Sequence, residues 1–372
     1  MAPNENEGPP TTATPNPIAE ITDILKRSQL DSSSSQLEPT KSTVSEVDFS
    51  HISRWLSWCE KDVSHAECKA SPIQWQNLPG TQFKVIDIHR RCIVKAPEGC
   101  SFITLTYVWG GVDQPRLNAA TAPLLMRDGG LDVVWSKIPT TIRDAIVVCE
   151  QLGERYLWVD ALCIMQDSVR DMKLQILRMG QIYSAAKCAI VAVSAETAGI
   201  GLLGNPLAKH SQPLRACESE DSLNTLVESS PWSSRAWCYQ EKVLSHRLIL
   251  FTSNGIYMQC WKGTCDAKGT QLPDKEGQSF AKFNVVGGML SICPGEDLES
   301  YVSAVEYYSQ RKLTKQEDKM GAFEGIFRRY GSRMDGKESS FCYGLPICAF
   351  DQTICWRTRR HNPHLRNQSF PS

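Results

Sequence analysis

Between Phe102 and Ser194, apolar runs typical of buried strands alternate with amphipathic patterns typical of helices. Three of these runs, at 102–109, 156–164 and 188–193, are almost continuously apolar, which favours strands that are covered on both faces. Strands joined by helical crossovers lie parallel in one sheet, with right-handed connections. The alternation therefore predicts an α/β fold built on a parallel β-α-β-α-β core.

Two helical patterns separate the expected strands. The first begins at Pro139–Thr141 and ends before Gly153, and its apolar side chains are spaced to share one face. The second extends from Met172 to Ala186 with the same kind of spacing. We also expect added strands and helices on the flanks: a helix near 52–59, strands at 83–88 and 92–95, a helix at 236–244, strands at 247–252 and 256–261, and a helix at 313–330. The segments 194–231 and 262–300 have the composition of loops.

Composition divides the chain into four expected parts. Residues 1–47 are rich in Pro, Ser, Thr, Asn and Glu, and they bury too little apolar surface to offset the entropy of ordering, so we expect a disordered tail. Residues 48–100 would form a lead-in helix and strands, and 101–262 the α/β domain. Residues 263–372 would form a C-terminal extension of helices and loops.

The charge balance gives no reason to expect a strongly charged partner. Lys and Arg number 40 against 41 Asp and Glu, for a net charge of -1, so neither nucleic acid nor an anionic membrane surface is favoured. No stretch reaches the roughly 20 apolar residues of a membrane helix, and the N-terminus lacks the features of a signal peptide. We therefore expect a cytoplasmic protein without a membrane span, whose 15 cysteines are thiols.

A ligand site in an open α/β sheet lies beyond the carboxyl ends of the strands. In this chain those ends are 107–111, 163–167 and 194–196. Parallel strands would place all of them at one edge of the sheet, whatever the family of the protein. We therefore expect any site to be built from these segments.

Asp160 is the most unusual residue of the expected middle strand, because it interrupts an apolar run. With a period of two, it would share a strand face with Trp158 and Leu162. A buried carboxylate needs a cation or several hydrogen-bond donors, and Arg235 is the candidate partner. Two interpretations stay open, a structural Asp paired with an Arg and a member of a functional site.

Other conspicuous features have a structural interpretation that we favour. The motif at 199–204 matches G-x-G-x-x-G, but it does not join a strand to a helix, so we reject dinucleotide binding there. Cys163 could act as a nucleophile with His246 as its base, yet a thiol within an apolar strand is usually inert. Bulky apolar groups are more typical of a core than of a ligand platform, and this applies to Trp109, Trp158 and Trp237.

One group of residues has the chemistry of a metal site. Cys59, His65 and Cys68 offer three zinc ligands, and Cys92 or Cys100 could supply a fourth. The spacing lacks the paired C-x-x-C form of a strong zinc motif. We therefore favour packing over metal binding and treat these residues as weak candidates.

Several blocks of the chain carry a family resemblance in their order and spacing. They are Tyr107–Gly110, Ile138–Ala145, Leu152–Asp167, Met179–Tyr183, Arg235–Glu241 and Leu244–Arg247. Together they resemble the fungal heterokaryon-incompatibility (HET) domain over roughly residues 102–245. The flanking segments 55–68, 83–87 and 308–318 also resemble chains of this kind. Cys238–Tyr239 departs from the pair that is usual in the Arg-Ala-Trp block.

The resemblance implies a role in non-self recognition between fungal cells that ends in growth arrest or programmed cell death. It also implies a remote likeness to TIR domains, so the expected fold class becomes α/β with a TIR/flavodoxin-like parallel core. In the first interpretation of function, the α/β domain associates with itself or with another incompatibility protein, and assembly triggers toxicity. No cofactor is required in this interpretation.

The alternative is a TIR-like hydrolase that cleaves NAD, its substrate, to nicotinamide and ADP-ribose. Such a reaction needs a carboxylate beside the ribose. The catalytic candidates are Glu241 first, then Glu196, with Asp160 as partner. The candidates for ligand binding are Tyr107, Trp109, Gln166, Arg235, Trp237 and Gln240. A structural interpretation of Glu241, as a helix carboxylate paired with Arg247, also stays open.

Overall fold

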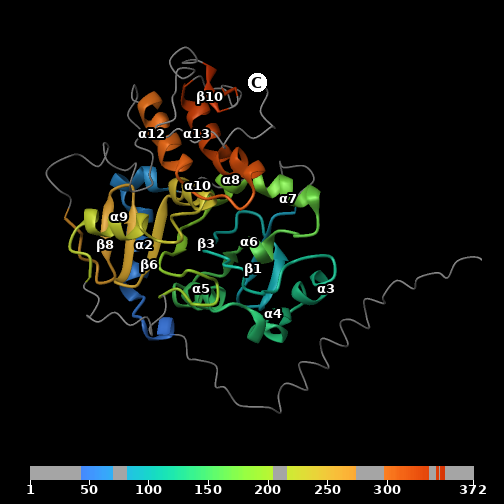
Figure 1. Cartoon of the computed structure of the whole chain (residues 1–372). Coiled ribbons are helices and arrows are strands. Elements are labelled where there is room, and N and C mark those ends of the chain that lie inside the picture. Colours follow the sequence, from blue (N-terminus) through green and yellow to red (C-terminus); the bar gives the residue numbers. More distant parts are fainter. Residues whose placement is uncertain are drawn as a thin grey trace, which may run out of the picture. The chain divides into compact units, whose positions relative to one another are not determined.

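The computed structural model describes residues 43–69, 82–203, 216–273, 297–334, 341–342 and 344–347. All of them belong to the compact unit Ser42–Ser372. The expected tail at 1–47 lies outside the described residues except for its last few positions. Figure 1 labels the helices and strands of the chain.

The described residues form a mixed sheet with the strand order β2-β1-β4-β3-β5-β6-β7-β8. The strands are β1 (Lys84–Asp87), β2 (Cys92–Lys95), β3 (Ile103–Thr106), β4 (Tyr156–Trp158), β5 (Ala189–Ala192), β6 (Arg247–Thr252), β7 (Gly255–Cys260) and β8 (Gly263–Asp266). Neighbours within β4-β3-β5-β6 are parallel, and the neighbours outside this group are antiparallel. The sheet thus has a parallel centre and antiparallel flanks.

The three strands that the sequence predicts to be parallel do lie parallel at the centre of the sheet. β3 lies between β4 and β5, with Ile103 in register with Leu157 and Thr104 with Ala189. Every residue of β3 and β5 is buried, as expected for strands covered on both faces. The mixed α/β fold is confirmed, whereas the likeness to TIR or flavodoxin-like folds stays a prediction.

The prediction of one strand over 156–164 is wrong. β4 ends at Trp158, and Asp160–Cys163 form the short helix α6. A short apolar run suits a buried helix as well as a buried strand, so periodicity could not separate the two. Asp160 is therefore the first residue of a helix and does not share a strand face with Trp158 and Leu162.

Two helical segments connect the parallel strands. α5 (Thr140–Gln151) follows Pro139 as predicted, and Gly153 adopts a positive φ of 72° two residues after its end. The second predicted helix is divided into α7 (Val169–Ile176) and α8 (Met179–Ala185). The apolar spacing continues across this break, which explains why the sequence suggests one helix.

The described structure includes residues that composition assigned to the tail. Thr43–Glu46 form the 3-10 helix η2, and Val44 is fully buried, so these positions pack on the core. The expected lead-in helix is α2 (Ser50–Lys61), which is followed by the 3-10 helix η3 (Val63–Cys68). Between β3 and α5 lie α3 (Ala122–Leu125), α4 (Gly130–Val133) and the 3-10 helix η5 (Trp135–Lys137).

Several elements lie in segments that composition assigned to loops. α9 (Glu220–Glu228) begins at a capping box in which Ser219 and Ser222 bond to each other's backbone N–H groups. β8 and α12 (Asp297–Ser309) occupy part of the segment 262–300. The described part of the G-x-G-x-x-G motif is a loop, as expected, with Gly201 at a φ of 98°.

The C-terminal part packs on the helices of the α/β domain. α10 (Ala236–Leu244) is present as predicted, and the expected helix at 313–330 is instead η6 (Gln316–Lys319), η7 (Gly321–Phe323) and α13 (Glu324–Met334). The small strands β9 (Phe341–Cys342) and β10 (Leu345–Pro346) form a separate antiparallel pair. α13 contacts α8 and α10, and Figure 1 shows α12 and α13 beside them. Within the described ranges, no helix has the length and apolar character needed to cross a bilayer.

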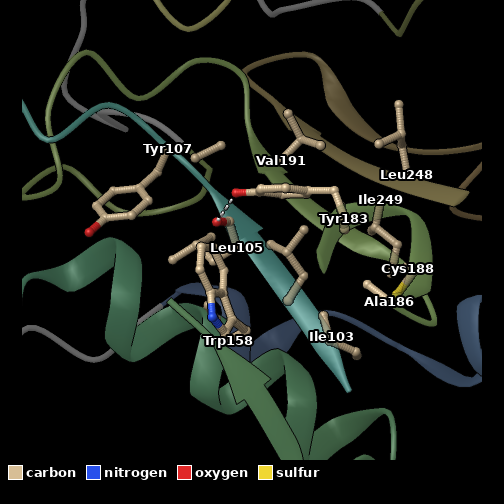
Figure 2. Packing of buried hydrophobic residues seen from close by; sticks show 14 of the residues in the cluster. Ile103, Leu105, Tyr107, Trp158, Tyr183, Ala186, Cys188, Val191, Leu248 and Ile249 are labelled. Atoms are coloured by element: carbon tan, nitrogen blue, oxygen red, sulfur yellow. Dashed lines mark hydrogen bonds between the residues drawn. The ribbon is translucent and has the colours of Figure 1, made fainter. Parts of the chain in front are cut away.

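Buried apolar side chains pack around β3, as Figure 2 shows. Trp158 is fully buried, which confirms its assignment to the core. Its ring makes an edge-on contact with Tyr183 of α8, with 5.8 Å between the ring centroids. The Tyr183 hydroxyl donates to the backbone oxygen of Leu105 at 3.2 Å, so the helix is anchored to the central strand.

Candidate functional site

A chain of buried hydrogen bonds begins where β3 ends. The indole N–H of Trp232 donates to the Thr106 hydroxyl at 2.7 Å, and that hydroxyl donates to the carboxylate of Glu241. Thr106 is the last residue of β3, and Glu241 lies on α10. The chain of bonds therefore fixes α10 against the carboxyl end of the central strand.

Glu241 has an environment that favours the protonated carboxyl group. The residue is only 7% exposed, and burial raises its pKa to about 7, helped by the negative charge of Asp160. The hydrogen bond from Thr106 and the charge of Arg235 act in the opposite direction. The carboxyl group therefore changes charge near neutral pH.

Asp160 lies at the start of α6, beside the same strand end. Its carboxylate accepts hydrogen bonds from the indole N–H of Trp109 at 2.9 Å and from the backbone N–H of Ala161 at 2.7 Å. Burial raises the pKa of Asp160, while these donors and Arg235 lower it. Trp109 also has the guanidinium of Arg116 over its ring, 5.2 Å from the centroid. Trp109 is therefore a polar contact of Asp160 as well as a packing residue.

Arg235 connects the strand end to the start of α10. Its guanidinium donates to the backbone oxygen of Tyr107 at 2.6 Å. Although no ion pair in the described chain joins Arg235 to Asp160 or Glu241, its positive charge lowers the pKa of both carboxyl groups. The expected partnership of Arg235 with Asp160 is thus electrostatic and acts without direct contact.

Two further buried polar side chains lie near this cluster. The hydroxyl of Tyr107 and the amide of Gln114 are both buried, and neither makes a hydrogen bond of ordinary geometry within the described residues. Burial raises the pKa of Tyr107 well above its usual value, and the Asp160 carboxylate adds to this effect. Three further residues of this region, Gln114, Thr106 and Trp232, could not be identified from the sequence. Thr106 is a polar residue within an apolar strand, whereas Gln114 and Trp232 lie in loop and turn segments and belong to no motif.

The structure therefore brings together five of the predicted residues at one strand end. These are Tyr107, Trp109, Asp160, Arg235 and Glu241. The arrangement combines two carboxyl groups, one guanidinium and two aromatic rings. Glu241 is buried and accepts a hydrogen bond. The contacts of the cluster therefore hold β3, α6 and α10 together.

The remaining predicted residues have other surroundings. Glu196 is exposed and makes no hydrogen bond or ion pair within the described part of the chain. The amide of Gln166 donates to the backbone oxygens of Asp160 and Ile164, at 3.0 Å and 3.1 Å. Gln166 therefore stabilises the backbone around α6.

The last two ligand candidates face the C-terminal part of the chain. Trp237 lies against Gly321, since a Cβ atom built there would be 3.6 Å from the indole ring. Gln240 is fully buried, and its side-chain oxygen accepts from the backbone N–H of Gly325 at 3.2 Å. Both side chains therefore connect α10 to its neighbours.

Cys163 and His246 do not form a catalytic pair. Cys163 is fully buried, and burial raises its thiol pKa to about 12. The Nδ1 atom of His246 lies 3.0 Å from the backbone oxygen of Glu67, to which it donates. The structural interpretation of this thiol agrees with its surroundings.

A second cluster contains the three weak metal candidates. Cys59, His65 and Cys68 are buried together, and Cys260 at the end of β7 joins them. Neither Cys92 nor Cys100, which could have supplied the fourth ligand, belongs to this cluster. Cys92, for example, points its thiol at Asp128, with the sulfur 3.6 Å from a carboxylate oxygen.

Comparison with known proteins gives two matches and one negative result. The family model described as Heterokaryon incompatibility protein (HET) matches residues 102–241. A curated relative, Heterokaryon incompatibility protein 6, OR allele, from Neurospora crassa, is 26% identical over 199 residues. This alignment covers 48% of the present chain and 28% of the relative. No solved structure matches the chain.

Proposed function

We propose that this chain, which carries a HET domain at residues 102–241, acts in heterokaryon incompatibility and brings about cell death through assembly of its α/β domain. The match to the HET family carries the proposal, and the contacts at the ends of the matched segment support it. Thr106, near its beginning, is hydrogen-bonded to Glu241, its last residue. A buried contact therefore joins the beginning of the matched segment to its end.

In this proposal the α/β domain associates with a second copy of the chain or with another incompatibility protein. The N-terminal tail would tether or regulate the domain. The likeness to TIR domains belongs to the same proposal, and the parallel centre of the sheet supports it. Recognition of a non-self partner would then increase the local concentration of the domains, and their assembly would stop growth.

The alternative of NAD cleavage has less support. Its first catalytic candidate, Glu241, is 7% exposed and accepts a hydrogen bond from Thr106. Its second candidate, Glu196, is exposed and has no hydrogen bond or ion pair to the described residues. A carboxylate that stabilises a sugar cation must contact the ribose, and the burial of Glu241 opposes such a contact.

Expression of the full chain in a fungal host tests the proposal. Under an inducible promoter, we expect growth arrest and staining of dead cells, together with association of the purified chain in sedimentation. Substitution Glu196→Gln should leave both effects intact, because this side chain is exposed and makes no bond within the described ranges. Normal growth at high expression of the full chain would contradict the proposal.

The same cultures separate assembly from NAD cleavage. If assembly causes death, NAD should stay at its normal level until the cells die, and the purified, associated chain should release no nicotinamide. Early loss of NAD, abolished together with toxicity by Glu241→Gln in a variant that keeps its circular dichroism spectrum, would instead favour the hydrolase.

A further inference from the structure

We propose that Cys59, His65, Cys68 and Cys260 bind one Zn²⁺ ion in a structural site that joins the lead-in segment, residues 43–69, to β7. The four residues are buried, and their ligand atoms all lie within 4.8 Å of one another. This inference goes beyond the role in incompatibility and is independent of it.

The distances within the cluster agree with a tetrahedral zinc site. The Nδ1 atom of His65 lies 3.2 Å from the sulfur of Cys59, 3.4 Å from that of Cys68 and 3.6 Å from that of Cys260. Zinc bonds of about 2.3 Å to sulfur and about 2.0 Å to nitrogen place these atoms about 3.5 Å apart in a tetrahedron. A single ion can therefore contact all four ligand atoms.

Hydrogen bonding alone does not explain this arrangement. Three sulfur atoms surround one imidazole nitrogen, and that nitrogen has either one lone pair or one proton to offer. At most one of the thiols of Cys59, Cys68 and Cys260 can therefore be properly paired with the Nδ1 atom of His65. A metal ion at the centre would serve all four residues at once.

The surroundings of the cluster suit a zinc ion bound by thiolates. Three thiolates and one Zn²⁺ ion carry a net negative charge, and the Nε atom of Arg247 donates to the sulfur of Cys59 at 3.3 Å. The backbone N–H of Lys262 lies 3.5 Å from the sulfur of Cys260 and donates to it. Such outer contacts orient metal ligands and stabilise their charge.

Local structure explains how the four ligands meet. Cys59 lies near the end of α2, and His65 and Cys68 lie on η3, where His65 has a non-helical backbone. The ring of Trp58 contacts the His65 ring edge-on, with 4.4 Å between the centroids. This contact helps to fix the orientation of the imidazole.

The ligand set indicates a structural role for the ion. A catalytic zinc keeps one position open for water or substrate, whereas four protein ligands close the coordination sphere. His65, the most exposed of the four, is only 3% exposed. Since Cys260 is far along the chain from the other three, the ion would hold the lead-in segment onto the sheet.

Metal analysis of the full chain tests the proposal. Purified without chelators from zinc-supplemented cells, it should contain one equivalent of zinc per chain by mass spectrometry. After removal of zinc under reducing conditions, addition of Co²⁺ should give the thiolate charge-transfer and visible bands of tetrahedral cobalt. Added Zn²⁺ should displace the Co²⁺ ion and abolish these bands.

Variants connect the ion to the proposed residues. Cys260→Ser should lose most of the bound zinc and the cobalt bands, whereas Cys265→Ser on the adjacent β8 should keep one equivalent. If Cys260→Ser does not fold, the wild-type measurements decide alone. The proposal is overturned if the wild-type chain holds no stoichiometric zinc and gives no cobalt bands. It is also overturned if Cys260→Ser keeps its zinc, or if mass spectrometry shows a disulfide among these cysteines.

Discussion

The hydroxyl of Thr106 donates to the carboxylate of Glu241, although 135 residues separate the two in the sequence. The same hydroxyl accepts the indole N–H of Trp232 at 2.7 Å. All three side chains are buried, so water does not replace these hydrogen bonds when one partner is removed. A buried polar network of this kind stabilises the fold only while its members are paired.

The first prediction concerns Thr106→Val. The substitution keeps the shape of the side chain but leaves Trp232 and Glu241 without their partner. We expect the free energy of unfolding to fall by about 1–3 kcal/mol per buried group left unpaired. Thr104→Val on the same strand is the matched control, because the Thr104 hydroxyl is buried and makes no hydrogen bond within the described residues. Urea unfolding should show a loss for Thr106→Val and little change for Thr104→Val. Equal effects would contradict the proposed network.

The second prediction concerns the pH dependence of stability. The folded-state pKa of Glu241 is raised to about 7 from its ordinary value of 4.5. Between these values the folded state holds a proton that the unfolded state releases, so stability decreases as pH rises through this range. Glu241→Gln removes the titration. We expect its free energy of unfolding, relative to the wild type, to increase by about 2 kcal/mol between about pH 5 and about pH 8.

Urea unfolding at several pH values measures this effect. Glu196→Gln, which changes an exposed carboxylate, should follow the pH profile of the wild type. Asp160→Asn should weaken the wild-type dependence, because the negative charge of Asp160 contributes to the raised pKa of Glu241. If Glu241→Gln and the wild type have parallel profiles, Glu241 does not titrate in this range.

Periodicity predicted the parallel centre of the sheet because buried strands and amphipathic helices have distinct apolar patterns. It failed at Asp160, because the single apolar run at 156–164 contains both the short strand β4 and the short helix α6. The pairing of Thr106 with Glu241 could not be predicted either. Nothing in the local sequence of either residue indicates its partner, and only the folded chain brings them together.

The same limit applies to the cysteine cluster. Cys59, His65 and Cys68 are close in sequence and could be recognised as a group, whereas Cys260 lies on β7 in a different part of the chain. From the sequence, Cys92 or Cys100 could have been the fourth member. The folded chain decides otherwise, because it brings Cys260 of β7 to within 3.6 Å of the Nδ1 atom of His65 on η3.

The third prediction concerns the close contact of α8 and α13. A Cβ atom at Gly325 would lie 2.6 Å from the Leu244 side chain and 2.8 Å from the Cα atom of Gly180. Gly325→Ala should therefore force the helices apart and lower the free energy of unfolding by about 1–3 kcal/mol. At Gly321 a Cβ atom would lie 3.5 Å from its nearest neighbour, so Gly321→Ala is the matched control.

Thermal unfolding compares the two variants. A decrease confined to Gly325→Ala, in a single transition, would show that residues beyond the HET match stabilise the same folded unit. Two separate transitions, or no difference between the variants, would mean that α13 contributes little to the stability of the α/β domain.

The fourth prediction concerns Arg247, whose Nε atom donates to the sulfur of Cys59 at 3.3 Å. Loss of a hydrogen bond to a metal ligand typically weakens metal binding about 10–100-fold. Arg247→Gln should therefore reduce the zinc affinity by this factor. Lys262→Gln is the control, because the Lys262 side chain binds Glu67 while only its backbone N–H meets Cys260. Competition with a chromophoric chelator measures both affinities. Equal zinc affinity in the two variants would show that Arg247 does not stabilise the thiolate of Cys59.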